Sequence, residues 1–247
     1  THIPRETLDR KLGGILEIYE KFQGVDPRET PMKIFPAVHY SMGGLWVDYE
    51  RSGSGGLVEG SPRNQQTNIP GLYAIGECDY QYHGANRLGA NSLLSCIFSG
   101  LFCASGVIAG SRKPGAEAGR LLTAAVKRQE ERHQAILSRP AGDSNPYDIH
   151  GKLGDVMTRT ATVVRRNDQL AEAYDEVCRL EGLWQHCSLS DTGNWTNQNV
   201  VFTKSLGDMF PIAKLILKGA LLRDECRGAH YKPEFAMPGI EATDPAE

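Results

Sequence analysis

Residues 88–111, LGANSLLSCIFSGLFCASGVIAGS, contain no Asp, Glu, Lys or Arg. A charge-free run of this length constrains the fold strongly, because about 20 apolar residues in one helix are enough to cross a bilayer. Most of the run consists of Gly, Ser, Ala, Asn and Cys, and such small residues allow helices to pack closely. The run therefore favours a buried helix packed through its small residues over a transmembrane span.

The sequence before this run predicts extended segments separated by loops. IFPAVHYSMGGLWVD, over 34–48, is interrupted at Gly43 and Gly44, and the polar stretch over 51–68 reads as a Gly/Ser-rich loop. GLYAIGE, over 71–77, predicts a short apolar strand. After a glycine-interrupted loop, Asn91 and Ser92 are placed to cap the helix that continues toward Ile108.

Apolar residues recur at helical spacing in the rest of the chain. A short helix is predicted over 5–22, and a linker containing VDPRETP follows it. Beyond residue 115 the chain predicts a helical bundle with short connections. Its helices are expected over 116–137, 152–166, 167–184 and 197–224, with a loop around 140–148.

Composition excludes some classes of function. The 27 Lys and Arg residues are spread along 247 residues and the net charge is −3, which supplies no basic surface for nucleic acid. The six cysteines form no CxxC pair and no metal-ligand spacing, and the chain opens with polar residues rather than a signal peptide. A reducing cytoplasmic environment is therefore expected.

Two side chains of the glycine-rich, weakly charged region are candidate ligand-binding groups. Arg87 lies in GANRLGANS, and its planar guanidinium can donate two parallel hydrogen bonds to a carboxylate. Alternatively, it satisfies carbonyl groups of its own loop. His39 lies in HYSMGG, where it is either a ligand-binding imidazole or a core histidine bonded to backbone. His83 is the third polar residue of this region.

Two further features point to a ligand site. Glu77 ends the predicted strand, and α/β sheets often place ligand-binding groups at the carboxyl ends of their strands. Its alternative role is that of a solvated strand end. The backbone N–H groups of Asn91, Ser92 and Leu93 open the long apolar helix and attract an anion or an electron-rich carbonyl, unless the helix caps itself.

Several catalytic signatures are absent from the sequence. It has no GxGxxG dinucleotide fingerprint, no GxxxxGK[ST] phosphate loop, no GxSxG elbow and no HExxH. From the residues alone, the chain is predicted to bind a carboxylate near an apolar cofactor pocket, without a complete catalytic set.

Three longer motifs carry a family resemblance. MKIFPAVHYSMGGLWVD, NIPGLYAIGECDYQYHGANRLGANSLL and RGAHYKPEF resemble the flavoprotein subunit of succinate dehydrogenase and fumarate reductase. The first two look like the bacterial succinate:menaquinone type in particular. The resemblance extends from about residue 5 to 236. It implies an α+β fold, in which the C-terminal part of an FAD-binding flavoprotein domain precedes an α-helical bundle domain.

The resemblance assigns roles to the candidate residues. His39 matches a histidine that hydrogen-bonds a substrate carboxylate, and Arg87 an arginine that clamps a carboxylate of succinate or fumarate. Glu77 matches a glutamate that contacts the ribityl chain of FAD. The helix start at Asn91, Ser92 and Leu93 matches the backbone beside the pyrimidine edge of the flavin. The implied reaction is the FAD-dependent oxidation of succinate to fumarate.

The resemblance also implies that parts of the site lie elsewhere. The family's FAD phosphate loop, the histidine that bonds covalently to FAD and the proton-transfer arginine all precede the matching segment, so no catalytic residue is expected here. The chain is expected to be inactive without an amino-terminal half. The implied domains are the end of a capping domain and a linker over 1–30, the FAD and substrate part over 31–112, and the helical part over 113–247.

The family's setting implies partners and alternatives. Electrons are expected to pass through an iron–sulfur subunit to quinone, with a membrane-anchor cytochrome b subunit holding the complex at the cytoplasmic face of the inner membrane. The alternatives are a fumarate reductase, an L-aspartate oxidase-like flavoenzyme or a noncatalytic assembly module. Direction of turnover is not encoded in these residues.

Three further segments have features of their own. The loop RSGSGGLVEGSPRNQQ is longer than the family pattern leads us to expect. Arg227 and His230, in RGAHYKPEF, either anchor the tail, which we favour, or bind a partner. Cys96 and Cys103, one heptad apart, are expected to be small core residues rather than ligands.

Overall fold

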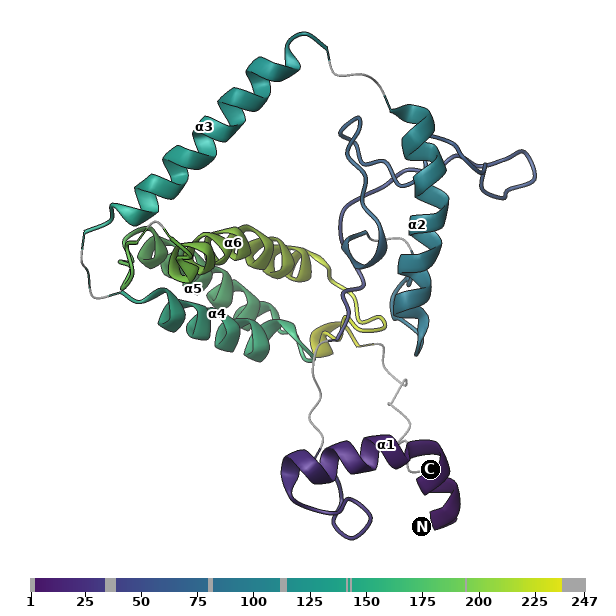
Figure 1. The fold of residues 1–247 in the computed structure, drawn as a ribbon. Coiled ribbons are helices and arrows are strands. Elements are labelled where there is room, and N and C mark those ends of the chain that lie inside the picture. The colour runs from purple at the N-terminus through teal and green to yellow at the C-terminus, as the bar shows by residue number, and fades with distance from the viewer. Residues whose placement is uncertain are drawn as a thin grey trace. The chain divides into compact units, whose positions relative to one another are not determined.

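The computed structural model describes residues 3–33, 39–79, 82–111, 115–140, 142, 144–193 and 195–236. Helices predominate in these ranges (Figure 1). Contacts between residues group the chain into two compact units, Thr1–Val38 and His39–Glu247. The three-part division at residues 30 and 112 stays a prediction.

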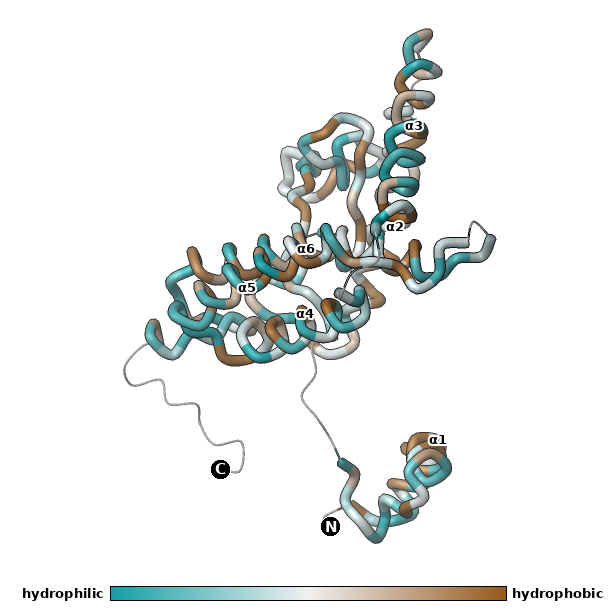
Figure 2. The backbone as a smooth tube through the Cα atoms, turned by 90° about the vertical axis from the view of Figure 1, so that its left-hand side faces the viewer, coloured by the Kyte–Doolittle hydropathy of each residue, from teal (hydrophilic) through white to brown (hydrophobic). Residues whose placement is uncertain are grey.

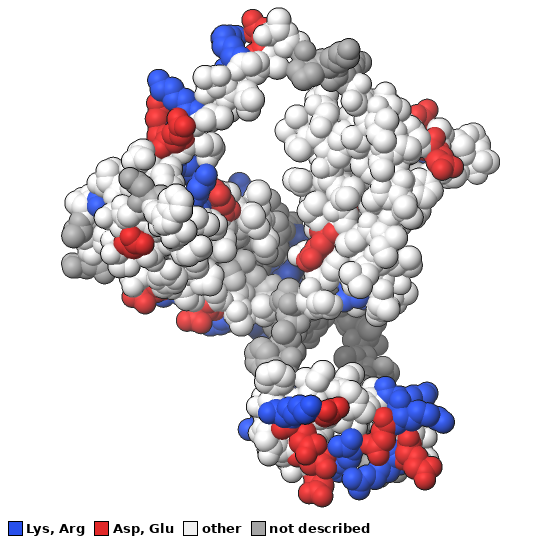
Figure 3. Space-filling model, in the orientation of Figure 1, with Lys and Arg blue, Asp and Glu red and all other residues white. Residues whose placement is uncertain are grey.

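The first unit contains α1 (Arg5–Gln23), which confirms the helix predicted over 5–22. Glu6 lies in its first turn and Lys21 in its last, the placement that the helix dipole favours. The helix ends where Gly24, with a left-handed φ of 68°, donates its N–H to the Glu20 carbonyl. Of its side chains only Leu16 is buried, and Figure 3 shows the dense cover of charges on this unit.

The charge-free run forms α2 (Asn91–Gly110) in the second unit. Its buried residues are Ser95, Ser99, Cys103 and Gly106, so the predicted packing through small residues is confirmed. The prediction of a buried helix holds for that face only, because Leu93, Leu94, Ile97, Leu101 and Ile108 are exposed. By length and composition α2 is the one helix of the described chain that could cross a membrane, a property it shares with core helices of soluble proteins.

The segment before α2 has little regular structure. The predicted strand over 71–77 is wrong: Tyr73 makes a single antiparallel bridge with Gln66, and Gly76–Cys78 forms the short 3₁₀ helix η1. In the predicted extended segment, residues 34–38 lie outside the described ranges, and Leu45 makes one parallel bridge with Asp79. The 51–68 loop contains a small hairpin, in which Arg51 pairs with Leu57.

Beyond residue 115, the described residues form four helices and a short 3₁₀ helix. Asn145 and Asn197 cap two of these helices, since their side chains accept hydrogen bonds from Tyr147 N and Val200 N. The predicted helix over 152–166 begins earlier and stops at Ala161, while the other three predictions are correct to within two residues. The elements are α3 (Ala118–Leu137), α4 (Pro146–Ala161), α5 (Asn167–Gln185), α6 (Gln198–Leu222) and η2 (Pro233–Phe235).

The core of the bundle lies between α4, α5 and α6, each of which packs on the other two, while α3 contacts α6. Hydrophobic and hydrophilic residues alternate along these helices, as Figure 2 shows. Leu170, Val177, Leu180, Leu206, Phe210 and Leu217 are completely enclosed. Burial of large side chains such as these contributes about 1.5–3 kcal/mol each, which makes this the main hydrophobic core of the described chain.

Candidate functional site

Tyr40 is the centre around which the candidate residues gather. Its ring is buried, and its hydroxyl lies 3.1 Å from the Ser95 hydroxyl on α2. Ser95 in turn donates to the Ser92 carbonyl at 2.7 Å, within the first turn of the helix. The HYSMGG motif is thereby joined to the start of α2 by side-chain hydrogen bonds.

Arg87 lies over the face of the Tyr40 ring, with its guanidinium carbon 5.3 Å from the ring centroid. A cation over an aromatic face is stabilised by the ring quadrupole. The Nη1 atom donates to the Leu88 carbonyl at 3.1 Å, so the alternative role, satisfying a loop carbonyl, accounts for one of its donors. The Nε atom is buried and has no partner within the described residues, so one donor of the guanidinium is left unsatisfied.

His83 packs against the edge of the same ring. The His83 and Tyr40 centroids are 5.0 Å apart and the rings are nearly perpendicular, at 87°. Its Nε2 atom is also buried and unpartnered within the described ranges. The sequence singled out His83 and Arg87 together, and the structure brings both against Tyr40, whose role the sequence reasoning missed.

His39 is exposed, so the alternative of a core histidine is wrong. The two glycines of its motif differ in their surroundings. Gly43 has no atom within 4 Å of where a side chain would begin, whereas a Cβ on Gly44 would overlap the Cys78 carbonyl. Gly44 is therefore required by packing on η1, and only Gly43 leaves backbone open to another molecule.

Glu77 lies on η1 rather than at the end of a strand. It is exposed, and its Oε1 accepts the Ser41 N–H at 3.0 Å, which orients the carboxylate. Contact with α2 fixes η1, because Gly76 lies against Cys96, and a Cβ there would be 2.8 Å from the Cys96 sulfur. Hydrogen bonding and packing thus connect Glu77 to both the HYSMGG motif and α2.

The start of α2 is open. Ala90 occupies the capping position with a left-handed φ of 66°, and no side chain makes a capping hydrogen bond there. The prediction that Asn91 and Ser92 cap the helix is therefore wrong; Asn91 is the first helical residue. An uncapped N-terminus leaves backbone N–H groups that can bind an anion or a polar heterocycle edge.

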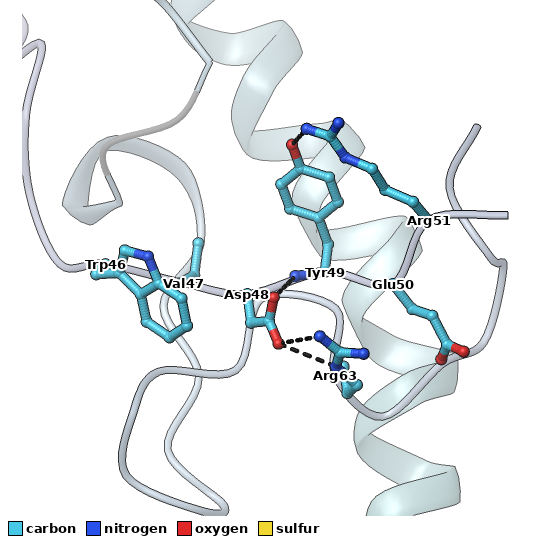
Figure 4. Close-up of a pocket in the computed structure, with 7 residues that line it drawn as sticks. All are labelled: Trp46, Val47, Asp48, Tyr49, Glu50, Arg51 and Arg63. Carbon is cyan, nitrogen blue, oxygen red and sulfur yellow. Dashed lines mark hydrogen bonds and ion pairs between the residues drawn. The ribbon is translucent and has the colours of Figure 1, made fainter. Parts of the chain in front are cut away.

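A shallow hollow of about 500 Å³ lies apart from these residues, lined by Trp46–Arg51 and Arg63 (Figure 4). Its charged groups already have partners within the chain, Glu50 through a hydrogen bond from the Ser61 hydroxyl. Arg63 donates to Asp48 Oδ2 from Nε at 2.9 Å and from Nη2 at 2.7 Å, and Arg51 donates to the Tyr49 hydroxyl. None of the predicted site residues lines this hollow, and its satisfied polar groups give no reason to place the ligand there.

Comparison with known proteins supports the resemblance. Residues 1–93 match the FAD binding domain family, and residues 150–241 match the family described as fumarate reductase flavoprotein C-term. The chain is 47% identical to the succinate dehydrogenase flavoprotein subunit of Bacillus subtilis, over 95% of this chain and 38% of that protein. It is 31% identical to the fumarate reductase flavoprotein subunit of Haemophilus influenzae, over 95% and 37%.

Solved structures show the same likeness. An E. coli quinol fumarate reductase variant matches 100% of this chain and 39% of its own, with a TM-score of 0.79 at 27% identity. The Mycobacterium smegmatis Sdh1 complex in the apo form matches 94% and 37%, with a TM-score of 0.75 at 26% identity. The chain spans somewhat over a third of the length of these relatives, and over that part its sequence and fold resemble those of succinate dehydrogenase and fumarate reductase flavoprotein subunits.

Proposed function

We propose that this chain supplies the dicarboxylate-clamping and helical portion of an FAD-dependent flavoprotein that oxidises succinate to fumarate. The observation that carries the proposal is Arg87: a partly buried guanidinium, held on the Tyr40 ring, with an unpartnered Nε. A planar cation with free donors suits a carboxylate, because two parallel N–H bonds can form at once. Arg87 and His39 are the proposed substrate-binding residues.

The residues around Tyr40 fit the flavin. The N-terminus of α2 offers the amides of Ser92 and Leu93 to an electron-rich ring edge, while the Asn91 N–H, the third amide of the prediction, donates to the Leu88 carbonyl at 3.3 Å. Glu77 offers an oriented acceptor for hydroxyl groups. FAD, when bound, would accept the two electrons that leave the substrate as a hydride, and the accompanying proton would pass to the proton-transfer arginine that the family resemblance places before this chain. The α2 N-terminus favours negative charge beside it, and so favours the reduced state of such a group.

The protein's own part in the reaction is positioning and charge stabilisation. Arg87 would hold one carboxylate by two hydrogen bonds, and His39 would donate to a carboxylate oxygen. A dicarboxylate held at both ends has lost most of its rotational freedom before reaction, which lowers the barrier. The fixed cation also stabilises the charge that builds up on the carboxylate as the C–H bond breaks.

The family resemblance also supports the proposed electron-transfer partners. Electrons would pass from FAD through an iron–sulfur subunit to quinone, and a cytochrome b subunit would anchor the complex at the cytoplasmic face of the membrane. The chain is 47% identical to a succinate dehydrogenase subunit and 31% identical to a fumarate reductase subunit, and the proposal names succinate oxidation on that likeness. The direction of turnover depends on the redox partners rather than on these residues. An L-aspartate oxidase-like activity and a noncatalytic assembly role are the alternatives.

The test uses this chain combined with an amino-terminal flavoprotein half and FAD. Flavin absorbance and succinate oxidation with an artificial electron acceptor are measured for the chain alone and for the mixture. Activity that appears only in the mixture supports the proposal. Flavin binding without oxidation of succinate or L-aspartate would support the noncatalytic assembly role. Oxidation of L-aspartate but not of succinate would support the L-aspartate oxidase-like activity.

Arg87→Lys tests the clamp, with Arg63→Lys as the matched control, because Arg63 pairs with Asp48 on another surface. An ammonium cannot reproduce the two parallel bonds. Loss of one charge-assisted bond, about 1.5–3 kcal/mol, corresponds to a fall of about 10- to 100-fold in kcat/KM. Equal kcat/KM values in the Arg87→Lys and Arg63→Lys variants would show that Arg87 does not bind the substrate.

A further inference from the structure

The motif RGAHYKPEF, to which the sequence attached no chemistry, forms a tight turn at Arg227–His230. Arg227 N–H donates to the His230 carbonyl at 2.9 Å, and His230 N–H donates to the Arg227 carbonyl at 3.1 Å. Gly228 occupies the turn with φ +58°. These bonds define a compact unit, which we call the C-terminal turn.

The helical bundle holds the C-terminal turn through His230, whose side chain is only 2% exposed. Arg165 Nη1 lies 2.8 Å from His230 Nδ1, and His230 Nε2 lies 2.9 Å from the Arg223 carbonyl. Since a carbonyl only accepts, Nε2 carries the proton and Nδ1 accepts from Arg165. His230 thus anchors the tail, as the sequence analysis favoured.

Lys232 and a parallel bridge strengthen this attachment. The Lys232 side chain is fully buried, and its Nζ donates to the Leu221 and Arg223 carbonyls at the end of α6, at 3.0 and 3.1 Å. Tyr231 bridges Val164, and its carbonyl accepts the Arg165 N–H at 2.9 Å. The turn is therefore fixed to α6 and to the connection between α4 and α5.

The other side of the turn touches the loop that carries Arg87. Ala229 N–H donates to the Ala85 carbonyl at 3.0 Å. Gly228 lies so close to Ala85 that a Cβ would overlap the Ala85 carbonyl group and lie 2.8 Å from the Ala85 Cβ. Ala85 precedes Arg87 by two residues, so the contact acts on the backbone that sets the direction of the guanidinium.

We propose that the C-terminal turn is a positioning clamp, through which the helical bundle holds the Arg87 loop in the conformation that binds a dicarboxylate. The proposal rests on the proposed function of Arg87. Residues 228 and 229 are positioning residues, since they act only through the loop backbone. Fixing a loop in its binding conformation removes an ordering penalty from each binding event, and a displacement of about 1 Å at a reacting group can cost about 100-fold in rate.

Hydrogen exchange of this chain tests the clamp without any turnover. Gly228→Ala places a methyl group against Ala85 and is expected to speed amide exchange of residues 83–90 by about tenfold or more, while α4, α5 and α6 stay protected. Gly55→Ala is the matched control, because Gly55 also has a positive φ, +86°, and open space around it. It introduces similar backbone strain without the contact.

His230→Leu is the second variant, since it loosens the turn from the bundle without adding atoms at Ala85. The same local acceleration is expected in 83–90. Unchanged exchange there in both variants would overturn the clamp. Faster exchange that appears only together with general loss of protection in α4, α5 and α6 would overturn it as well.

Dicarboxylate binding links the clamp to function in the flavoprotein reconstituted with its amino-terminal half. The dissociation constant for malonate, followed by flavin absorbance, is expected to rise about 10- to 100-fold in Gly228→Ala, with flavin content unchanged and Gly55→Ala like the wild type. A wild-type protein that binds no dicarboxylate would refute the proposed function, whereas wild-type affinity in Gly228→Ala would refute the clamp alone.

Discussion

The same substitution at two glycines of α6 is expected to change stability in opposite directions. Glycine in a helix interior is less favourable than alanine by about 0.5–1 kcal/mol, because it loses more backbone freedom on folding. A Cβ on Gly219 would meet nothing within 4 Å, so Gly219→Ala should stabilise the protein by about that amount. A Cβ on Gly207 would overlap Cζ2 of Trp184 and lie 2.7 Å from its Cη2.

The Trp184 indole has little room to move away. Its Nε1 donates to the Thr203 carbonyl at 2.7 Å, and the Arg139 guanidinium lies over the ring, 4.9 Å from its centroid. Overpacking of a core costs about 1–3 kcal/mol, and loss of the indole hydrogen bond would add about 1 kcal/mol. After the gain in helix propensity is subtracted, Gly207→Ala should destabilise the protein by about 1–3 kcal/mol.

Urea unfolding followed by far-UV circular dichroism measures both changes. With a slope of about 1–3 kcal/mol per molar urea, the Gly207→Ala midpoint should fall by roughly 1 M, while that of Gly219→Ala should rise slightly. Tryptophan fluorescence of the folded protein, to which Trp184 contributes, should change in Gly207→Ala only. The reasoning is refuted if Gly207→Ala is as stable as the wild type, or if both midpoints move the same way.

Three further predictions concern the tail and the site. Lys232→Met leaves the Leu221 carbonyl at the end of α6 without its Nζ donor, removes one of the donors to the Arg223 carbonyl and breaks the ion pair with Asp224. It should lower the unfolding free energy by about 1–3 kcal/mol, whereas Lys218→Met, at an exposed position of α6, should change it little in the same urea assay. Burial, with a smaller contribution from neighbouring cations, lowers the pKa of His230 below its usual 6.5. The unfolded state therefore binds more protons than the folded state. The contribution of neutral His230 to the unfolding free energy is complete above pH 6.5 and should be lost as the pH falls through the lower pKa of the folded state. An identical loss of unfolding free energy in His230→Leu would contradict this cause. His39→Ala, in the reconstituted flavoprotein, should weaken malonate binding and retain flavin, and a loss of flavin absorbance would instead give His39 a structural role.

Local patterns made the helices predictable. Helix periodicity over 5–22, 167–184 and 197–224 reports contacts between residues three or four apart, so the bounds follow from nearby residues. The 71–77 prediction failed because a strand is defined by hydrogen bonds to another segment, and Tyr73 finds only a single bridge to Gln66. The capping prediction at the start of α2 failed for a similar reason, because the apolar pattern did not indicate that Ala90 would take a left-handed φ at the capping position.

The candidate site was predictable as a set of residue types. His39, Glu77, Arg87 and the 91–93 amides follow from short motifs, and their assigned roles stay proposals. Tyr40 was missed as the residue that joins them, because its neighbours His83, Arg87 and Ser95 lie 43 to 55 positions away in the sequence. Its place inside HYSMGG was the one available signal.

By itself, the sequence determined the helices, the small-residue face of α2 and the motifs that carry the family resemblance, because these depend on local spacing and on residue identity. Only the tertiary structure decided that Gly207 lies under Trp184 and that Gly228 touches Ala85. It also placed His230 between Arg165 and the Arg223 carbonyl. Such close contacts form between segments that are far apart in the sequence. The identity of a glycine or a histidine does not by itself indicate which atoms will surround it in the fold.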